Sequence, residues 1–195
     1  MEPDDANVSD MKVAPGTFLV AGPELLDPNF MHAVVLMCQH SDQGAIGLVV
    51  NQPLPHTTSE AFPDHPLLGS IDLPIFQGGP VELDSMQFVH RVPDEIPESV
   101  PLSAGLWWGQ AESVAAYLER AGAQAVETVR LFIGYSGWGA GQLEGELVSG
   151  VWLPAAGSST LVFDADRDSL WREVLRSLGD AAEGLSDQPP DPSWN

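Results

Sequence analysis

The apolar residues of this chain come in short runs, and the length of these runs constrains the fold more than any other feature. The two longest runs, Ala33–Cys38 and Ile46–Val50, have the length of strands. No stretch reaches the ~20 apolar residues that a membrane-spanning helix needs. The connecting residues, 39–45, include Gly44, so the two runs predict a β-hairpin of largely buried strands. Since 44% of the 195 residues are hydrophobic, the chain can bury the core of one large domain.

Other short runs predict further strands, and prolines and glycines predict the loops between them. Additional strands are expected at 16–21, 75–76, 86–90, 129–134, 148–153 and 160–163. Helices are expected at 110–121 with Gly122 as the C-terminal cap, at 142–148, from Asp168 onward, and after Asp27-Pro28. Prolines 53, 55, 63, 66 and 74 predict that most of 52–74 is loop, and prolines 93, 97 and 101 predict a second loop. Because strands outnumber helices and mostly follow one another through loops, the sequence predicts an α+β fold.

The charge of the chain is strongly negative and limits the partners that it can have. Asp and Glu number 28 against 7 Lys and Arg, which gives a net charge of −21. A uniformly acidic surface repels phosphates, so direct nucleic-acid binding is unexpected. The surface either meets a basic partner or is simply solvated, and we favour the second interpretation.

The ends of the chain indicate where the protein works. The N-terminal decapeptide carries four acids and no basic residue, so we do not expect it to be a secretory signal, and a single cysteine, Cys38, fits a reducing compartment. We therefore expect a cytoplasmic protein that makes no contact with a membrane. The expected organisation is a flexible acidic N-terminus (1–12), one α+β domain (13–179) and an acidic C-terminal tail (180–195).

A glycine-rich segment, 134–144, resembles several catalytic motifs and satisfies none of them. A nucleophile elbow needs a glycine two residues on each side of its serine; Gly134 precedes Ser136 correctly, but Trp138 follows it. The segment also lacks the lysine of a phosphate-binding loop and the glycine spacing of a dinucleotide fingerprint.

Two interpretations of this segment stay open. Backbone N–H groups before the helix at 142–148 could hold an anion, although Glu144 and Glu146 would compete for the same positive helix end. Alternatively, the glycines allow a tight turn that packs around Trp138, and we favour this second interpretation.

Cys38 and His40 alternate on one predicted strand end and could face the same side. They are two ligands where structural zinc needs four, and as a nucleophile pair they have no identifiable third member, so burial of Cys38 is favoured. An enzyme would use Ser136 or Cys38 as nucleophile with His40 or His90 as base. No metal site and no cofactor are predicted.

Motifs spread along the chain resemble those of the YqgE/AlgH family. They include Gly-Thr-Phe-Leu-Val-Ala at 16–21, Gly-Ala-Ile-Gly-Leu-Val-Val-Asn-Gln-Pro at 44–53, Gly-Gly-Pro-Val at 78–81, the segment 134–144 and Asp-Pro-Ser-Trp-Asn at 191–195. The resemblance implies a single α+β domain whose bifurcated, mostly antiparallel sheet closes into a small barrel flanked by helices. The family is largely uncharacterised, and one branch is named as a regulator of alginate production, which makes a transcriptional regulator an alternative by family name.

Our leading hypothesis from the sequence is a non-enzymatic binding or regulatory protein that acts through a small-molecule or protein contact. The candidate pocket or partner surface consists of Gly78, Gly79, Pro80, Tyr135, Ser136, Trp138, Gly139, Gly141, Gln142 and Glu144, with Cys38, His40 and Asn51 as secondary candidates. The test of this set is whether Pro80, Tyr135, Trp138 and Gln142 line one cavity.

Overall fold

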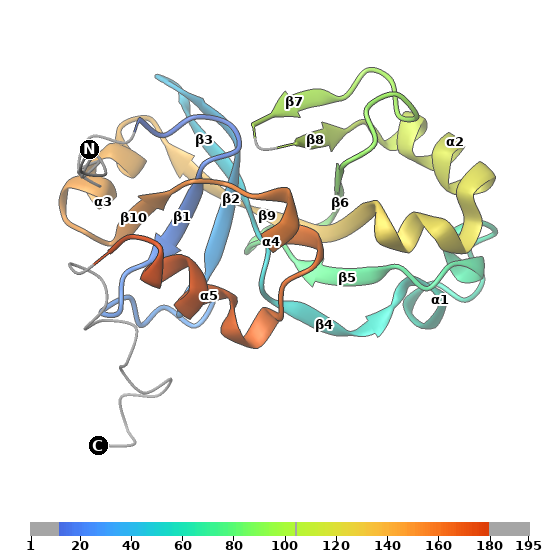
Figure 1. Ribbon diagram of the computed structural model, residues 1–195, viewed down its shortest axis with the longest axis horizontal. Coiled ribbons are helices and arrows are strands. Elements are labelled where there is room, and N and C mark those ends of the chain that lie inside the picture. Colours follow the sequence, from blue (N-terminus) through green and yellow to red (C-terminus); the bar gives the residue numbers. More distant parts are fainter. Residues whose placement is uncertain (1–11, 104, 180–195) are drawn as a thin grey trace, which may run out of the picture.

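The computed structural model describes residues 12–103 and 105–179, and Figure 1 shows how their helices and strands are arranged. In chain order these are β1 (Phe18–Ala21), β2 (Val34–Ser41), β3 (Gly44–Val49), β4 (Pro53–Thr57), α1 (Thr58–Ala61), η2 (Leu68–Ser70), β5 (Pro74–Gln77), β6 (Val81–His90), β7 (Val100–Leu102), β8 (Leu106–Gly109), α2 (Ala111–Ala121), η3 (Gly122–Glu127), β9 (Val129–Gly139), α3 (Gln142–Val148), β10 (Trp152–Ala155), α4 (Ser159–Phe163) and α5 (Arg167–Arg176). The tails predicted at 1–12 and 180–195 lie outside the described residues, apart from Lys12. No helix in the described part of the chain is long and apolar enough to cross a membrane.

The strands form one ten-stranded sheet that forks at β9. Its main path runs β10-β1-β2-β3-β9-β6-β8-β7, with antiparallel neighbours throughout. Residues 131–133 of β9 pair in parallel with β5, which also pairs with β4, whereas residues 136–139 pair with β3. The sheet curls into a half-barrel (Figure 1), so the α+β class and the bifurcated, mostly antiparallel sheet are confirmed.

The predicted hairpin is confirmed, because β2 and β3 pair in antiparallel register. Both faces of this part of the sheet are buried. Along β1, Phe18 and Val20 pack into a core cluster that includes residues of α4 and α5, whereas Leu19 and Ala21 pack into a second cluster that includes α3. Burial on both faces explains why these strands appear in the sequence as continuous apolar runs.

Strand β9 is longer than the sequence predicts. It continues past Gly134 to Gly139, so the first part of the glycine-rich segment is a strand and not a turn. The extension is stabilised by backbone pairing with β3, which joins Gly44 to Gly139 and Ala45 to Trp138. The helix that was expected at 142–148 then follows as α3.

The prediction that 52–74 is mostly loop is wrong, because β4, α1 and η2 occupy much of it. Strand β4 pairs with β5 alone, so prolines 53 and 55 sit in an edge strand, where a missing N–H is tolerated. Pro101 likewise lies in β7, which ends the main path of the sheet.

Three other elements differ from the prediction. The run 160–163, expected as a strand, belongs to helix α4, whose N-cap Ser158 accepts a hydrogen bond from the Leu161 N–H. No helix follows Asp27, where the backbone makes turns that end at His32, in the left-handed region at φ 56°. The strand expected at 148–153 begins only at Trp152, because Val148 still belongs to α3.

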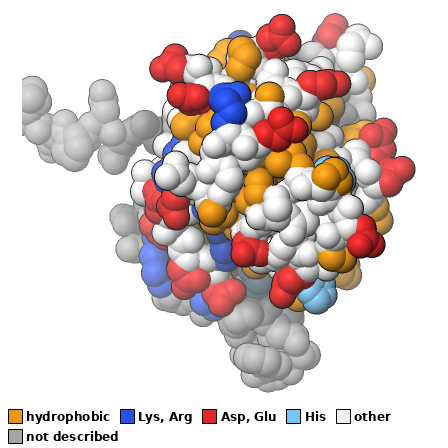
Figure 2. Space-filling model, turned by 90° about the vertical axis from the view of Figure 1, so that its right-hand side faces the viewer, with side chains coloured by type: hydrophobic (Ala, Val, Ile, Leu, Met, Phe, Trp, Pro, Cys, Tyr) orange, Lys and Arg blue, Asp and Glu red, His pale blue; other side chains and the backbone are white. Residues whose placement is uncertain are grey.

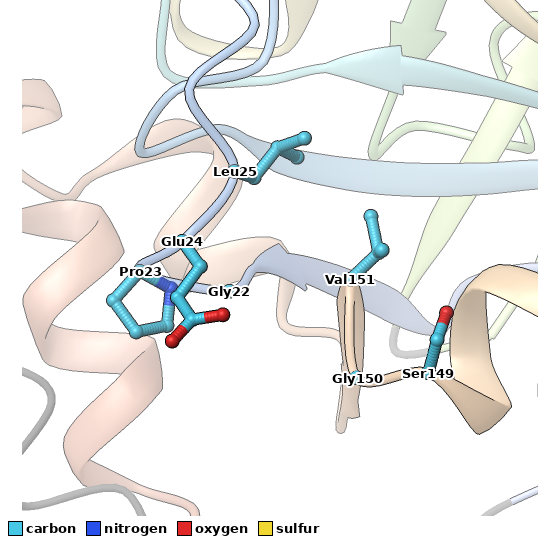
Figure 3. A pocket seen from close by; sticks show the side chains of 7 residues that line it. All are labelled: Gly22, Pro23, Glu24, Leu25, Ser149, Gly150 and Val151. Carbon is cyan, nitrogen blue, oxygen red and sulfur yellow. The ribbon is translucent and has the colours of Figure 1, made fainter.

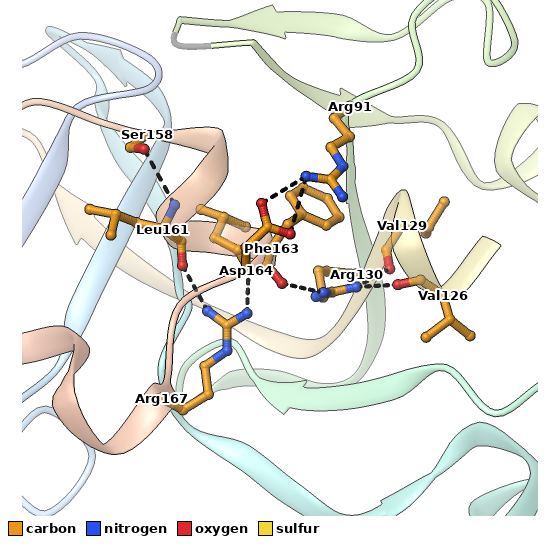
Figure 4. Close-up of polar contacts among 10 residues, drawn as sticks. Arg91, Val126, Val129, Arg130, Ser158, Leu161, Phe163, Asp164 and Arg167 are labelled. Carbon is orange, nitrogen blue, oxygen red and sulfur yellow. Dashed lines mark hydrogen bonds and ion pairs between the residues drawn. The ribbon is translucent and has the colours of Figure 1, made fainter. Parts of the chain in front are cut away.

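Arg130 of β9 connects α4 to the sheet through hydrogen bonds (Figure 4). Its guanidinium donates hydrogen bonds to the carbonyl oxygens of Val126 at 2.6 Å, Val129 at 3.1 Å and Phe163 at 2.7 Å. The Phe163 ring also lies against the guanidinium groups of Arg91 and Arg130, at 4.7 and 4.5 Å from its centroid. Burial, followed by repulsion from neighbouring arginines, lowers the pKa of Arg130 to about 10.

Two further arginines hold the C-terminal end of α4. Arg167 donates to the carbonyls of Leu161 and Val162 at 3.0 and 2.5 Å, and Arg91 pairs with Asp164 at 3.1 Å. The two contacts of Arg167 satisfy helix carbonyls that have no partner within the helix, and the Arg91 ion pair holds the residue that caps its C-terminus.

Figure 2 shows the end of the molecule that carries α1 and α2. Acidic side chains are scattered over this face among apolar and neutral ones and do not gather in one patch. Such a distribution is typical of a solvated surface.

Candidate functional site

A pocket of about 380 Å³ opens between α3, β10 and the turns that follow β1. We call it the α3 pocket, and it is lined by Leu25, Asp27, Phe30, Gly137, Trp138, Gln142, Glu146, Val151 and Trp152. The charged residues of this set are both carboxylates, Asp27 and Glu146. The α3 pocket is therefore aromatic and negatively charged.

Three aromatic rings form one wall of the α3 pocket. The Phe30 and Trp152 rings meet edge to face at 5.5 Å between centroids, and the Trp138 and Trp152 rings do so at 5.9 Å. Trp138 and Trp152 are buried and Phe30 is half-buried. Edge-to-face contacts of this kind fix the orientation of the rings.

The Glu146 carboxylate is held in place by three donors. Its Oε2 accepts from the indole N–H groups of Trp138 at 2.8 Å and Trp152 at 2.9 Å, and its Oε1 accepts from Gln142 Nε2 at 2.9 Å. The Gln142 Oε1 in turn accepts from the Gly139 N–H at 3.1 Å. This network joins β9, α3 and β10 and places a fixed carboxylate beside two aromatic rings.

A second cavity of about 390 Å³ adjoins the α3 pocket and is shown in Figure 3. It is lined by Gly22, Pro23, Glu24, Leu25, Ser149, Gly150 and Val151, so the two cavities share Leu25 and Val151. The Gly22 N–H donates to the Val151 carbonyl at 2.9 Å and joins the two sides. We call the two cavities together the acidic groove. It is lined by three carboxylates, those of Asp27, Glu146 and Glu24, and by no positively charged residue.

The residues predicted for a pocket are only partly brought together. Trp138 and Gln142 line the α3 pocket, whereas Pro80 and Tyr135 do not. Tyr135 pairs with Val81 in the sheet, and burial together with the Glu82 carboxylate raises the pKa of its phenol.

Gly78 and Gly79 pack directly against the backbone of β9. A Cβ atom on Gly79, at φ +153°, would lie 2.3 Å from the Tyr135 carbonyl carbon, and one on Gly78 would lie 2.4 Å from the Gly134 carbonyl oxygen. The buried Ser136 hydroxyl donates to the Gly78 carbonyl at 3.1 Å. Gly78 and Gly79 connect β5 to β6, and the absence of a Cβ atom allows this connection to pack closely on the backbone of β9.

The remaining candidates of the glycine-rich segment have local structural roles. Gly141 is the N-cap of α3 in the left-handed conformation at φ +74°, and Glu144 points to His40, at 2.8 Å from its Nε2. This hydrogen bond lowers the pKa of Glu144. Asn51 links the Val34 N–H to the His32 carbonyl, at 2.8 and 2.9 Å.

Cys38 and His40 do not face the same side, contrary to the expectation. The pairing of β2 with β3 shifts register between Met37 and Gln39, so Cys38 is the extra residue of a bulge. The Cys38 thiol is buried, and burial raises its pKa far above its usual range. His40 lies on the α3 side, where its Nδ1 is 3.1 Å from the Val13 carbonyl oxygen. Within the described residues, neither Cys38 nor Ser136 has a hydrogen bond to a histidine.

The proposed base His90 contacts a serine that the sequence does not single out. His90 Nε2 is 2.7 Å from the Ser99 Oγ, while its Nδ1 accepts from the Val92 N–H at 3.3 Å. Since Nδ1 accepts, Nε2 carries the proton of the neutral ring and donates to Ser99, whose hydroxyl donates to the Ile96 carbonyl. In this tautomer His90 cannot take a proton from Ser99, so the pair is structural.

Sequence reasoning predicted two of the residues that line the α3 pocket, Trp138 and Gln142, and missed the others, among them Asp27, Phe30, Glu146 and Trp152. One signal was available: Glu146 follows Gln142 by four residues on a predicted helix, a spacing that puts both side chains on one face. Nothing local predicts that Phe30 joins them. Across residues 12–103 and 105–179, no group of three or more His, Cys, Asp and Glu side chains is arranged to hold a metal ion.

Comparison with known proteins gives consistent matches over most of the chain. The AlgH-like family matches residues 18–183. A UPF0301 protein of Chlorobaculum tepidum is 38% identical over 181 residues, which cover 93% of this chain and 95% of that protein. A UPF0301 protein of Streptomyces avermitilis is 35% identical over 195 residues, covering 97% of this chain and 100% of that protein.

Two solved structures are similar in fold. The solution structure of the AlgH protein from Pseudomonas aeruginosa is 27% identical, with a TM-score of 0.67 over 97% of this chain and 98% of that one. A crystal structure of a protein from Corynebacterium diphtheriae is 22% identical, with a TM-score of 0.75 over 91% of this chain and 94% of that one.

Proposed function

The chain belongs to the AlgH-like family, and from that premise we propose that it is a non-enzymatic binding protein whose α3 pocket holds a positively charged organic group. The group is an ammonium or guanidinium, carried by a small molecule or by a Lys or Arg side chain of a partner protein. A single observation carries the proposal: the Glu146 carboxylate is fixed by two indole N–H groups inside an aromatic pocket.

The chemistry of the α3 pocket favours a cation over other ligands. Aromatic rings attract cations through the negative potential of their faces, and a carboxylate supplies the opposite charge. The Glu146 Oε1 accepts one hydrogen bond, from Gln142, and a carboxylate oxygen has room for a second. Asp27 also lines the pocket and adds a second negative charge, so an anionic ligand would be repelled.

The arrangement of Glu146 suits the binding of a ligand, because three hydrogen bonds hold its carboxylate in one position. The acidic groove also gives no support to direct contact with nucleic acid, whose phosphates it would repel.

The first experiment measures thermal stabilisation of the full-length protein by cations and by neutral molecules of the same shape. Arginine is compared with citrulline, and choline with 3,3-dimethyl-1-butanol. We expect a melting temperature that rises with arginine or choline concentration and does not rise with the neutral partner. Equal stabilisation by citrulline and arginine would contradict the proposal. Comparing free arginine with a short arginine-containing peptide distinguishes a small-molecule ligand from a protein side chain.

A matched pair of variants tests whether the binding occurs in the α3 pocket. Glu146→Gln keeps an oxygen that can accept from the indoles but removes the charge, and we expect at least about tenfold weaker cation binding, or ~1.4 kcal/mol. Glu144→Gln removes the same charge from the same helix, on the side that faces His40, and is expected to bind like the wild type. Equal weakening in both variants would indicate a general charge effect and would overturn the assignment of the site.

A further inference from the structure

A third cavity, of about 210 Å³, lies against α5, and the charge of its lining is opposite to that of the α3 pocket. We call it the α5 pocket; it is lined by Met31, His32, Asn51, Gln52, Arg167, Asp168, Trp171 and Arg172. Two arginines and a histidine line it, against one carboxylate, in a chain that has 7 basic residues against 28 acidic ones. The α5 pocket is thus a local concentration of positive charge in an acidic protein.

The two arginines of the α5 pocket differ in their contacts. Both terminal nitrogens of Arg167 already donate hydrogen bonds to carbonyls at the end of α4, so fewer of its donors remain for a ligand. Arg172 has neither a hydrogen bond nor an ion pair with any described residue, although Asp168 lies one turn before it on α5. Arg172 is half-buried, and because its guanidinium has no partner among the described residues, all of its donors are available to a ligand there.

His32 is placed beside Arg172 by an unusual backbone conformation. Its φ of 56° lies in the left-handed region, which residues with a Cβ atom rarely adopt. Asn51 Nδ2 stabilises this turn through the His32 carbonyl at 2.9 Å, and the imidazole lies 4.3 Å from the Trp171 ring. Neither nitrogen of the His32 ring has a partner among the described residues, so both are available to the pocket.

The charges around His32 favour a bound anion. Burial, and then the positive charge of Arg172, lower the pKa of His32. The other charged groups that line the pocket with it are Arg167 and Asp168, both also on α5. An anion between His32 and Arg172 would replace this repulsion with two attractive contacts.

We propose that the α5 pocket binds a small oxyanion, a phosphate or carboxylate group, through Arg172 and His32. The volume is sufficient for one such group, and the guanidinium fork suits its oxygens. The Gln52 amide, whose Nε2 donates one N–H to the Asn29 carbonyl at 3.0 Å, offers its second N–H. The site is separate from the α3 pocket and shares no lining residue with it, so either proposal can be refuted without affecting the other.

The test is a calorimetric titration of the full-length protein with inorganic phosphate, sulfate and acetate, at constant ionic strength set with chloride. We expect saturable binding of at least one oxyanion, and the comparison of phosphate with acetate identifies the preferred group. Heat that only follows ionic strength would overturn the proposal. Binding is expected to tighten as the pH falls and His32 becomes protonated, because an anion favours the charged imidazole.

Two variants on one helix provide the control. Arg172→Gln is expected to weaken oxyanion binding at least about tenfold, which is the effect of one charge-assisted hydrogen bond of ~1.4 kcal/mol. Arg176→Gln removes the same charge from an exposed position of α5 that does not line the pocket, and is expected to bind like the wild type. Equal losses in both variants would refute a specific site.

A third variant tests the histidine without disturbing the turn. Asn tolerates the left-handed region better than most residues, so His32→Asn retains the backbone while removing the imidazole. It is expected to bind the anion more weakly and to lose the dependence of affinity on pH. A His32→Asn variant that keeps the full pH dependence would show that His32 takes no part.

Discussion

Replacing Arg130 with Met should destabilise the protein strongly, because the guanidinium connects three backbone carbonyls from two separate parts of the chain. Hydrogen bonds to a charged group contribute about 1.5–3 kcal/mol each, but the cost of burying the charge offsets part of their sum. The substitution leaves three backbone carbonyls without this donor, and a buried acceptor left unpaired costs about 1–3 kcal/mol, so we expect a net loss of ~3–5 kcal/mol. For a chain of this size that corresponds to a fall in melting temperature of roughly 6–20 °C.

The measurement is urea unfolding followed by tryptophan fluorescence and, independently, by circular dichroism. Arg120→Met is the control, since Arg120 is exposed and pairs with Glu95 at the surface, where the loss should stay below ~1 kcal/mol. Arg130→Lys, which keeps a charge but loses the planar fork, should fall between the two. If Arg130→Met costs no more than Arg120→Met, the burial cost cancels the hydrogen bonds, and Arg130 does not stabilise α4 as we infer.

Three other predictions concern buried groups. Burial lowers the pKa of His90 to about 4, so between pH 6.5 and pH 4 the unfolded state binds the extra proton and stability falls as the pH falls. Wild type should lose about 2 kcal/mol more than His90→Gln between pH 7 and pH 5 in urea titrations, and parallel profiles would contradict this. Gly79→Ala should lower the free energy of unfolding by ~3 kcal/mol or more, because the new Cβ would overlap the Tyr135 backbone. Gly141→Ala, whose Cβ would enter open space, should lower it by only ~1–2 kcal/mol. Equal losses of stability in thermal melting would argue against the close approach of Gly79 to β9. The buried Cys38 thiol should resist a thiol reagent until urea unfolds the chain, and rapid labelling under native conditions would show that the bulge opens.

Local sequence signals predicted those elements whose stability depends on nearby residues. Helix α2 has its apolar face and its cap, Gly122, within one stretch of chain, and the hairpin of β2 and β3 joins two apolar runs by a short connection. The expected barrel-like sheet came from a family resemblance and not from the pattern of residues. The bounds of β9 could not be predicted locally, because its extension to Gly139 depends on pairing with β3, far away in the sequence.

Tertiary contacts decided the remaining elements. The apolar run 160–163 has the composition of a strand, yet it forms α4, whose terminal carbonyls are satisfied by arginines from distant positions. The bulge at Cys38 interrupts the alternation along β2, so that Cys38 stays on the same side as Leu36 whereas His40 reaches α3. A pattern of alternating residues cannot show such a bulge in advance, because it arises from the register with the neighbouring strand.

The sequence by itself determined the family, the α+β class, the hairpin, α2 and the incompleteness of each catalytic motif, since all of these follow from residues at fixed spacing along the chain. It also directed attention to Trp138 and Gln142. Only the tertiary structure separated these two from Tyr135 and Pro80 and brought Glu146 to the indoles of β9 and β10. The α5 pocket could not be predicted from the sequence either, because His32 and Arg172 meet only when α5 packs against the turn before β2. Both pockets depend on contacts between residues that are distant in sequence, and local composition carries no information about such contacts.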